Sequence, residues 1–254
     1  MIENFYFYQS ADSNVESALA FHSVVFKKLE EINSLEGLTE SAAAFQKDGE
    51  KLKLWLLLDG KLSELVFDFI DGEVGFRATR VSKSNEVVAK ALGCKPHYRP
   101  SVLDATAGMG RDALIMAMLG CKVEMQERNP AIFELLANAL ERFETQGGAR
   151  ELVGELALSQ KNSIENLSQT QMEVIYLDPM FPERKKSALV KKEMRLFKKL
   201  AGEDVDADAL LLEALKSNAK RVVVKRPKGA PLLAGKKPSH EISAKKFRYD
   251  VYLK

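Results

Sequence analysis

Residues 102–112 read VLDATAGMGRD, an apolar stretch that ends in an acid and runs into a glycine-rich turn. The apolar residues before Asp104 are typical of a buried strand, and the apolar spacing from Asp112 to Leu119 predicts a helix. Gly108 and Gly110 lie between the two and allow a tight turn that brings the backbone close to a ligand. A strand, a glycine turn and a helix in this order begin an α/β unit with a parallel sheet.

The same alternation continues to the end of the chain. Apolar runs predict further strands at 122–126, 151–158, 173–177 and 221–224, and helical spacing predicts helices at 131–143, within 187–200 and at 206–217. The run at 247–253 predicts a last, antiparallel strand. We expect an α/β domain with a doubly wound, mostly parallel sheet.

The residues before this domain follow another pattern. Between 52 and 69, two apolar runs of high β propensity flank Asp59-Gly60, which is a strong hairpin signal. Residues 84–92 have the start and stop signals of a short helix, and Pro96 and Pro100 then interrupt regular structure. The pattern predicts a small α+β lobe, with a β-hairpin and a lead-in helix, over 1–93 and the α/β domain over 94–254.

Composition excludes several classes of protein. The chain has 254 residues, of which 46% are hydrophobic and 29% charged, as expected of a folded globular protein. Residues 1–10 lack the basic and apolar regions of a secretion signal, and the apolar run 54–58 is too short to span a bilayer. Cys94, Cys121 and three scattered histidines form no metal-ligand spacing. We expect a cytoplasmic protein with no membrane segment and no metal.

The net charge of +2 hides a strong asymmetry along the chain. Residues 1–182 carry a net charge of −9 and residues 200–215 one of −5, whereas 183–199 carry +6 and 216–254 carry +10. Gathered positive charge favours a polyanionic partner such as a nucleic acid, because it displaces the counterions of that partner. Solvated helix faces and a basic tail would give the same counts, so charge alone leaves both interpretations open.

Asp104 indicates which cofactor the glycine turn holds. By itself Gly-x-Gly-x-x-Ala also fits a dinucleotide site or a structural turn. A carboxylate at the strand end would repel a pyrophosphate, but it could pair with the ammonium of the methionine part of S-adenosylmethionine. We therefore predict a methyl donor at Asp104, Gly108 and Gly110. Glu127, at the end of the next strand, can accept both hydroxyls of the adenosine ribose, although an acid there is often only a helix first-turn residue.

Residues 174–182 read VIYLDPMFP, an apolar strand that runs into an acid, two prolines and an aromatic residue. The pattern resembles the Asp/Asn-Pro-Pro-Tyr/Phe motif of amino-group methyltransferases. An exocyclic base amine is a poor nucleophile, and acceptors at Asp178 and the Pro179 carbonyl would stabilise the positive charge that develops on its nitrogen. The ring of Phe181 could stack on the base. We predict these three residues as the catalytic set.

The motifs together resemble the RsmJ family, the bacterial small-subunit ribosomal RNA guanine-N2 methyltransferases. The resemblance covers roughly residues 80–254 and rests on ordered stretches at 104–113, 119–121, 127–130, 176–182, 186–195 and 224–227. It implies a class I, Rossmann-like domain with seven strands and a reaction on the guanine N2 amine of 16S ribosomal RNA or the 30S particle, with S-adenosylmethionine as the donor. It also implies donor contacts by the residues Arg111, Asp112, Glu127, Arg128, Asn162, Ser163 and Asp178.

The family pattern is not matched everywhere. Where the family has a glycine-rich lead-in, this chain has Ala78 to Ser84. The aromatic run Phe5 to Tyr8 fits a lobe core better than a base-stacking patch. The basic residues between 184 and 199 directly follow the predicted catalytic motif, which favours phosphate contact over mere solvation.

Two other functions stay open from the residues. An adenine-N6 methyltransferase on DNA or RNA would use the same acceptor chemistry. A ribosome-assembly factor could bind RNA and keep the cofactor fold without turnover, although the intact Asp104 and Asp178-Pro179 argue against that function.

Overall fold

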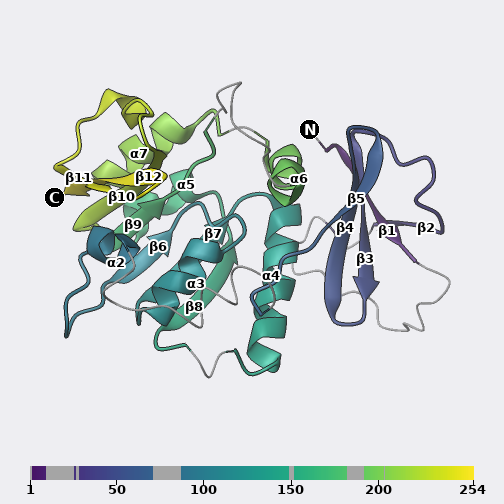
Figure 1. Cartoon of the computed structure of the whole chain (residues 1–254), viewed down its shortest axis with the longest axis horizontal. Coiled ribbons are helices and arrows are strands. Elements are labelled where there is room, and N and C mark those ends of the chain that lie inside the picture. Colours follow the sequence, from purple (N-terminus) through teal and green to yellow (C-terminus); the bar gives the residue numbers. More distant parts are fainter. Residues whose placement is uncertain are drawn as a thin grey trace. The chain divides into compact units, whose positions relative to one another are not determined.

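The computed structural model describes residues 2–9, 26, 29–70, 87–148, 152–181, 192–202 and 204–254 (Figure 1). By its internal contacts the chain forms two compact units, and both are discontinuous in sequence. The first unit comprises Met1–Asp68, Asn129–Gln146 and Phe181–Glu203, and the second comprises Phe69–Arg128, Gly147–Met180 and Asp204–Lys254. No helix among the described residues is long and apolar enough to cross a membrane.

The second unit is built on a seven-stranded sheet of order β11-β12-β10-β9-β6-β7-β8. Five strands are parallel, and β12 runs antiparallel to β10 and β11. This confirms the predicted seven strands and the antiparallel last strand. The strands are β6 (Ser101–Asp104), β7 (Lys122–Glu127), β8 (Glu155–Gln160), β9 (Val174–Leu177), β10 (Arg221–Pro227), β11 (His240–Ser243) and β12 (Phe247–Leu253).

The helices of the second unit pack on this sheet or on one another. The helix α3 (Arg111–Met118) contacts β7 and β8, and α2 (Val87–Leu92) contacts β10, β11 and β12. The helix α7 (Ala207–Lys216) packs on α5 (Ser163–Asn166). Two 3-10 turns, Leu167–Gln169 and Leu233–Gly235, complete the unit. The central strands supply the core, where Val102, Ile175 and Val223 are completely buried.

The strand order reverses beside β6, which has β7 on one side and β9 on the other. In open α/β sheets the carboxyl ends of the strands at such a reversal form the ligand-binding crevice. This topology brings together the ends of three parallel strands that are far apart in sequence.

The first unit contains a five-stranded sheet of order β2-β1-β3-β4-β5. Its strands are β1 (Asn4–Tyr8), β2 (Glu30–Ile32), β3 (Ala42–Asp48), β4 (Lys51–Leu58) and β5 (Lys61–Leu65). The β4–β5 pair confirms the predicted hairpin, and positive φ angles at Asp59 and Gly60 fit its two-residue turn. Phe5 packs on Phe26 and Phe45, with ring centroids 5.0 and 6.0 Å apart, so this aromatic ring belongs to the core.

Two helices from later in the sequence complete the first unit. The helix α4 (Pro130–Thr145) lies along β4, and α6 (Lys192–Ala201) contacts β4 and β5 (Figure 1). Asn129 caps α4 by accepting from the amides of Ala131 and Ile132. The sequence placed α4 with the α/β domain, whereas its packing places it with the N-terminal sheet. The division into 1–93 and 94–254 stays a prediction about the folding domains.

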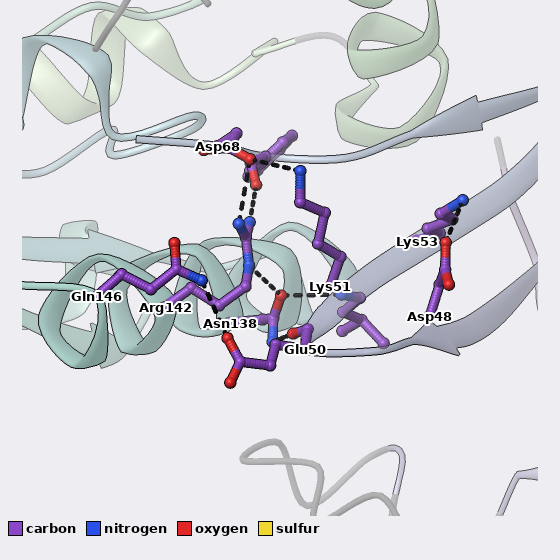
Figure 2. A network of polar contacts seen from close by, with 10 residues as sticks. Asp48, Glu50, Lys51, Lys53, Asp68, Asn138, Arg142 and Gln146 are labelled. Atoms are coloured by element: carbon purple, nitrogen blue, oxygen red, sulfur yellow. Dashed lines mark hydrogen bonds and ion pairs between the residues drawn. The ribbon is translucent and has the colours of Figure 1, made fainter. Parts of the chain in front are cut away.

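A buried polar network fixes α4 to this sheet (Figure 2). Arg142, only 3% exposed, donates to Asp68 at 3.1 Å, to the Phe67 carbonyl, and to the Asn138 side chain at 3.2 Å. The Asn138 amide group also binds the backbone of Leu52 and Glu50, each at 2.9 Å. Because a buried guanidinium is costly without partners, these bonds specify one seating of α4 on β4.

Candidate active site

Three predicted site carboxylates lie at one edge of the seven-stranded sheet. Asp104 ends β6, Glu127 ends β7, and Asp178 directly follows β9. The three strands are neighbours and parallel, so their carboxyl ends meet at the strand-order reversal. The structure therefore brings together the residues that the sequence singled out from three separate motifs.

The glycine turn is held against Glu127. Gly108 and Gly110 have φ angles of 52° and 69°, in the left-handed region where a side chain would be strained. The Gly108 amide donates to Glu127 Oε2 at 3.0 Å, and Gly110 is the N-terminal cap residue of α3. The bond to Gly108 fixes both the turn and the Glu127 carboxylate. Glu127 is itself buried.

Asp104 is 2% exposed and accepts from the Thr106 amide at 3.1 Å. Burial raises the pKa of Asp104 to about 8, and the nearby carboxylates of Asp112 and Asp178 add to the rise, against the amide of Thr106 and the charge of Lys225. The group is thus poised to ionise when a cation arrives.

Asp178 is fixed through both its backbone and its side chain. Its amide donates to Thr106 Oγ1 at 2.7 Å, and its Oδ2 accepts from Lys225 Nζ at 2.8 Å. The side chain stays 39% exposed, so it remains accessible from the crevice. Desolvation raises the pKa of Asp178, with a further rise from Asp112, while Lys225 opposes them. Pro179 follows as a buried residue.

Lys225 is a site residue that the sequence reasoning did not identify. It lies near the end of β10, beside β9, and its Nζ donates to both Asp178 and Asp112, the latter at 2.7 Å. Asp112 Oδ2 also accepts from the Tyr176 hydroxyl at 2.6 Å. The available signal was a lysine that follows the buried run Val222–Val224, where a charge requires partners.

The catalytic motif is held by Asp204, an acid from the negatively charged segment 200–215. Asp204 Oδ2 accepts from the Met180 amide at 2.7 Å, and its Oδ1 accepts from Arg128 at 2.7 Å. Arg128 also pairs with Asp206. The structure thus gives Arg128 partners inside the protein, and its contact with the donor stays a prediction.

The other predicted donor contacts lie around the same edge. The Ser163 hydroxyl, at the start of α5, is buried and donates to the Ala105 carbonyl at 2.8 Å, so it supports the turn after β6. Asn162 precedes it and donates to Glu165 at 2.8 Å. Arg111 begins α3. Phe181 is half-buried and, by its contacts, belongs to the first unit, so its base contact rests on chain order alone.

Part of the predicted basic segment has internal partners. Residues 182–191 lie outside the described residues, with Pro182 and the cations from Arg184 to Lys191 among them. On α6, Arg195 donates to Asp59 at 2.6 Å, and Lys199 pairs with Glu40 and donates to the Leu57 carbonyl at 2.8 Å. These two cations therefore hold α6 on the N-terminal sheet.

The residues present fit a sulfonium donor. Two buried strand-end carboxylates, Asp104 and Glu127, flank a turn with left-handed glycines, and they suit an ammonium and a ribose diol. The described part of the chain contains no group of three metal-ligating side chains.

Comparisons with known proteins agree with this chemistry. A family model described as "Putative SAM-dependent methyltransferase" matches residues 28–254. The ribosomal RNA small subunit methyltransferase J of Stutzerimonas stutzeri is 42% identical over 240 residues, which are 93% of this chain and 93% of the relative. That of Colwellia psychrerythraea is 46% identical over 204 residues, 80% of this chain and 75% of the relative.

A solved structure extends the likeness to the whole chain. The SAM-dependent methyltransferase NGO1261 of Neisseria gonorrhoeae has a TM-score of 0.72 and 28% identity, and the match covers 98% of this chain and 96% of the other. The likeness therefore includes the N-terminal sheet, which precedes residue 80, where the resemblance in sequence motifs begins.

Proposed function

This chain belongs to the SAM-dependent methyltransferase family that includes the ribosomal RNA small subunit methyltransferases J, and from that premise we propose that it methylates the N2 amine of a guanine in small-subunit ribosomal RNA. The observation that carries the proposal is the Asp178 carboxylate at the strand-order reversal, fixed by Thr106 and Lys225 and open to the crevice. We further propose that the enzyme acts in the cytoplasm, on ribosomal RNA or the 30S particle.

Each site residue has a task in this reaction. S-adenosylmethionine supplies an electrophilic methyl group. Asp104 would pair with the donor ammonium, and Glu127 would accept from the ribose hydroxyls. Asp178 and the Pro179 carbonyl would accept the amine N–H bonds, and Phe181 would stack on the guanine. As the N–C bond forms and the S–C bond breaks, Asp178 stabilises the charge on nitrogen, and one amine proton passes to the carboxylate and on to water.

Nucleoside analysis of ribosomal RNA tests the proposal. RNA from a strain without this gene should lack one N2-methylguanosine that the purified enzyme restores with S-adenosylmethionine. Appearance of N6-methyladenosine instead would assign the adenine chemistry. Donor binding with no methyl transfer to free RNA or to 30S particles would favour the assembly-factor role.

Replacing Glu127 should weaken donor binding. We expect Glu127→Ala to lower the affinity for S-adenosylmethionine at least several-fold, because the variant loses the ribose acceptor and the bond to the Gly108 amide. Calorimetric titration measures the change. Glu155→Ala, which removes an exposed acid at the amino end of β8, away from the site edge, is the control. A folded Glu127→Ala enzyme with the affinity of the wild type would remove Glu127 from the donor site.

Exposed lysines at the site edge should bind RNA phosphates. Many cations of 216–254 have partners within the protein, among them Lys225, Arg226 and Arg248. Lys228, Lys245 and Lys246, in contrast, are exposed. Lys228 follows β10, and Lys245 and Lys246 lie in the turn before β12, so all three lie at the carboxyl end of β10. That is the edge that holds Asp178.

Salt dependence of RNA binding tests this placement. Changing Lys228, Lys245 and Lys246 to Gln should flatten log affinity against log salt, by up to ~0.9 per lost contact on duplex and less on single strands. Lys236→Gln/Lys237→Gln is a matched control, because these exposed lysines precede Ser239, which pairs at the opposite end of β12. Equal slopes for the two variants would place the RNA elsewhere on the protein.

A further inference from the structure

The Asp178 carboxylate lies in a cluster of acidic groups. Asp112 from α3 raises the pKa of Asp178 through its negative charge, and Asp204 adds a weaker contribution. Asp104 from β6 interacts with Asp178 when both are ionised. The hydroxyls of Tyr176 on β9 and Tyr249 on β12 also face this cluster, and burial raises the pKa of both, so they stay neutral. Of the groups that act on Asp178, Lys225 supplies the positive charge.

The geometry of Lys225 is that of a bridge. Its Nζ lies 2.8 Å from Asp178 Oδ2 and 2.7 Å from Asp112 Oδ2. Asp112 is in turn held by the Tyr176 hydroxyl, and the ammonium lies 5.4 Å from the ring centroid of Phe247. Asp112 on α3 and Phe247 on β12 contact the ammonium directly, and Tyr176 on β9 acts through Asp112, so the ammonium has contacts that do not involve Asp178.

The bond from Lys225 to Asp178 Oδ2 determines the direction in which Oδ1 of the same carboxylate points. With Oδ2 held by Lys225 and the backbone amide held by Thr106, the Asp178 side chain has one orientation. We propose that Lys225 is a positioning residue, which holds the Asp178 carboxylate through Oδ2 and turns its Oδ1 toward the substrate amine. This inference rests on the proposed function, because it requires an amine that Asp178 accepts from.

The alternative is a purely structural role, in which Lys225 only balances buried charge in the fold. In either role, removing Lys225 should lower the free energy of unfolding, so a stability measurement cannot separate the two. They differ in the pH dependence of the chemical step. Desolvation and the neighbouring acids raise the pKa of Asp178, and Lys225 opposes them. Without Lys225 the carboxyl holds its proton to higher pH, and the acidic limb of the rate profile moves upward.

The experiment measures single-turnover methyl transfer against pH, with donor and RNA saturating. In Lys225→Met we expect the acidic limb to lie at least one pH unit higher than in the wild type, with partial recovery of rate at high pH. Lys225→Arg should keep the limb within about half a unit, because it restores the charge. Lys220→Met, which removes a surface pair between Lys220, just before β10, and Glu173, just before β9, should leave the profile unchanged.

A double variant adds a second measurement. If Lys225 acts through Asp178, Lys225→Met should slow the Asp178→Asn enzyme less than two-fold, although it slows the wild type at least ten-fold at neutral pH. The double variant also carries no unpaired Asp178 charge, so it tests the inference even if Lys225→Met alone does not fold. In that case Lys225→Gln, which keeps an N–H donor without the charge, takes its place in the pH profile.

The outcomes separate this inference from the proposed function. An unmoved acidic limb in a folded Lys225→Met or Lys225→Gln enzyme overturns the positioning role, as does an equal slowing in the wild-type and Asp178→Asn backgrounds. If Asp178→Asn and Asp178→Ala themselves transfer methyl at the wild-type rate, the proposed mechanism fails whatever Lys225 does.

Discussion

Asp178→Ala should lower the single-turnover rate of methyl transfer by about 10² to 10³, a loss of the size seen when one preorganised hydrogen-bonding group is removed from an active site. The reason is that the carboxylate interacts with the amine chiefly as positive charge develops, so its removal raises the barrier more than it weakens binding. RNA affinity should change far less than the rate. Rapid-quench measurements at saturating donor and RNA isolate the chemical step from both binding terms.

A conservative variant and a donor titration supply the controls for this experiment. Asp178→Asn keeps the shape and an acceptor oxygen but not the charge, so its rate should fall between those of the wild type and the alanine variant. Because Asp178 also belongs to the predicted donor site, the donor KM should be measured for each variant. A folded Asp178→Ala enzyme that keeps the wild-type single-turnover rate would leave the mechanism without its central acceptor.

Asp104→Asn should stabilise the donor-free protein and at the same time weaken donor binding. Asp104 has a folded-state pKa of about 8, against an ordinary 3.8. From about pH 4 upward the unfolded chain releases this proton while the folded chain retains it, so stability is lost progressively until pH reaches about 8. Each pH unit in that window costs about 1.4 kcal/mol at most. Asparagine keeps the acceptor for the Thr106 amide and does not ionise.

Thermal unfolding at two pH values measures this effect. The gain in Tm of Asp104→Asn over the wild type should be small at pH 5 and large at pH 8, with S-adenosylmethionine absent. With the donor present, the Tm of the variant should be lower than that of the wild type. The variant cannot pair with the ammonium, so it gains less stability from ligand binding. A gain in Tm that is the same at both pH values would show that Asp104 does not titrate in this range.

The sequence predicted the parts of the structure that depend on local pattern. Asp104 and Glu127 each end a strand and Asp178 directly follows one. Such positions can be predicted from the spacing of apolar residues and from the residues that end each run. The β4–β5 hairpin followed from Asp59-Gly60 in the same way. The strand β11 was missed, because three of its four residues, His240, Glu241 and Ser243, are polar and exposed and leave no apolar alternation.

What could not be predicted depends on pairings between distant segments. The bonds of Lys225 to Asp112 span 113 residues and those of Arg128 to Asp204 span 76, and nothing local in the sequence marks these partners. The parallel pairing of β1 with β2 and β3 is equally non-local. For α4, helical period was correctly interpreted, but its packing partner depends on Asn138 and Arg142, whose polar side chains resemble surface residues until their buried contacts are known.

The excess of acids at the sheet edge also bears on turnover. Asp104, Asp112 and Asp178 face one lysine, so the crevice is electronegative when they are ionised. A sulfonium ligand is attracted by this field, but the thioether that remains after methyl transfer has lost that positive charge. Asp112 and Asp178 should therefore attract the product less strongly than the donor, whereas the product keeps the ammonium that Asp104 would pair with. Loss of the sulfonium charge should thus favour exchange of the spent ligand for a fresh donor.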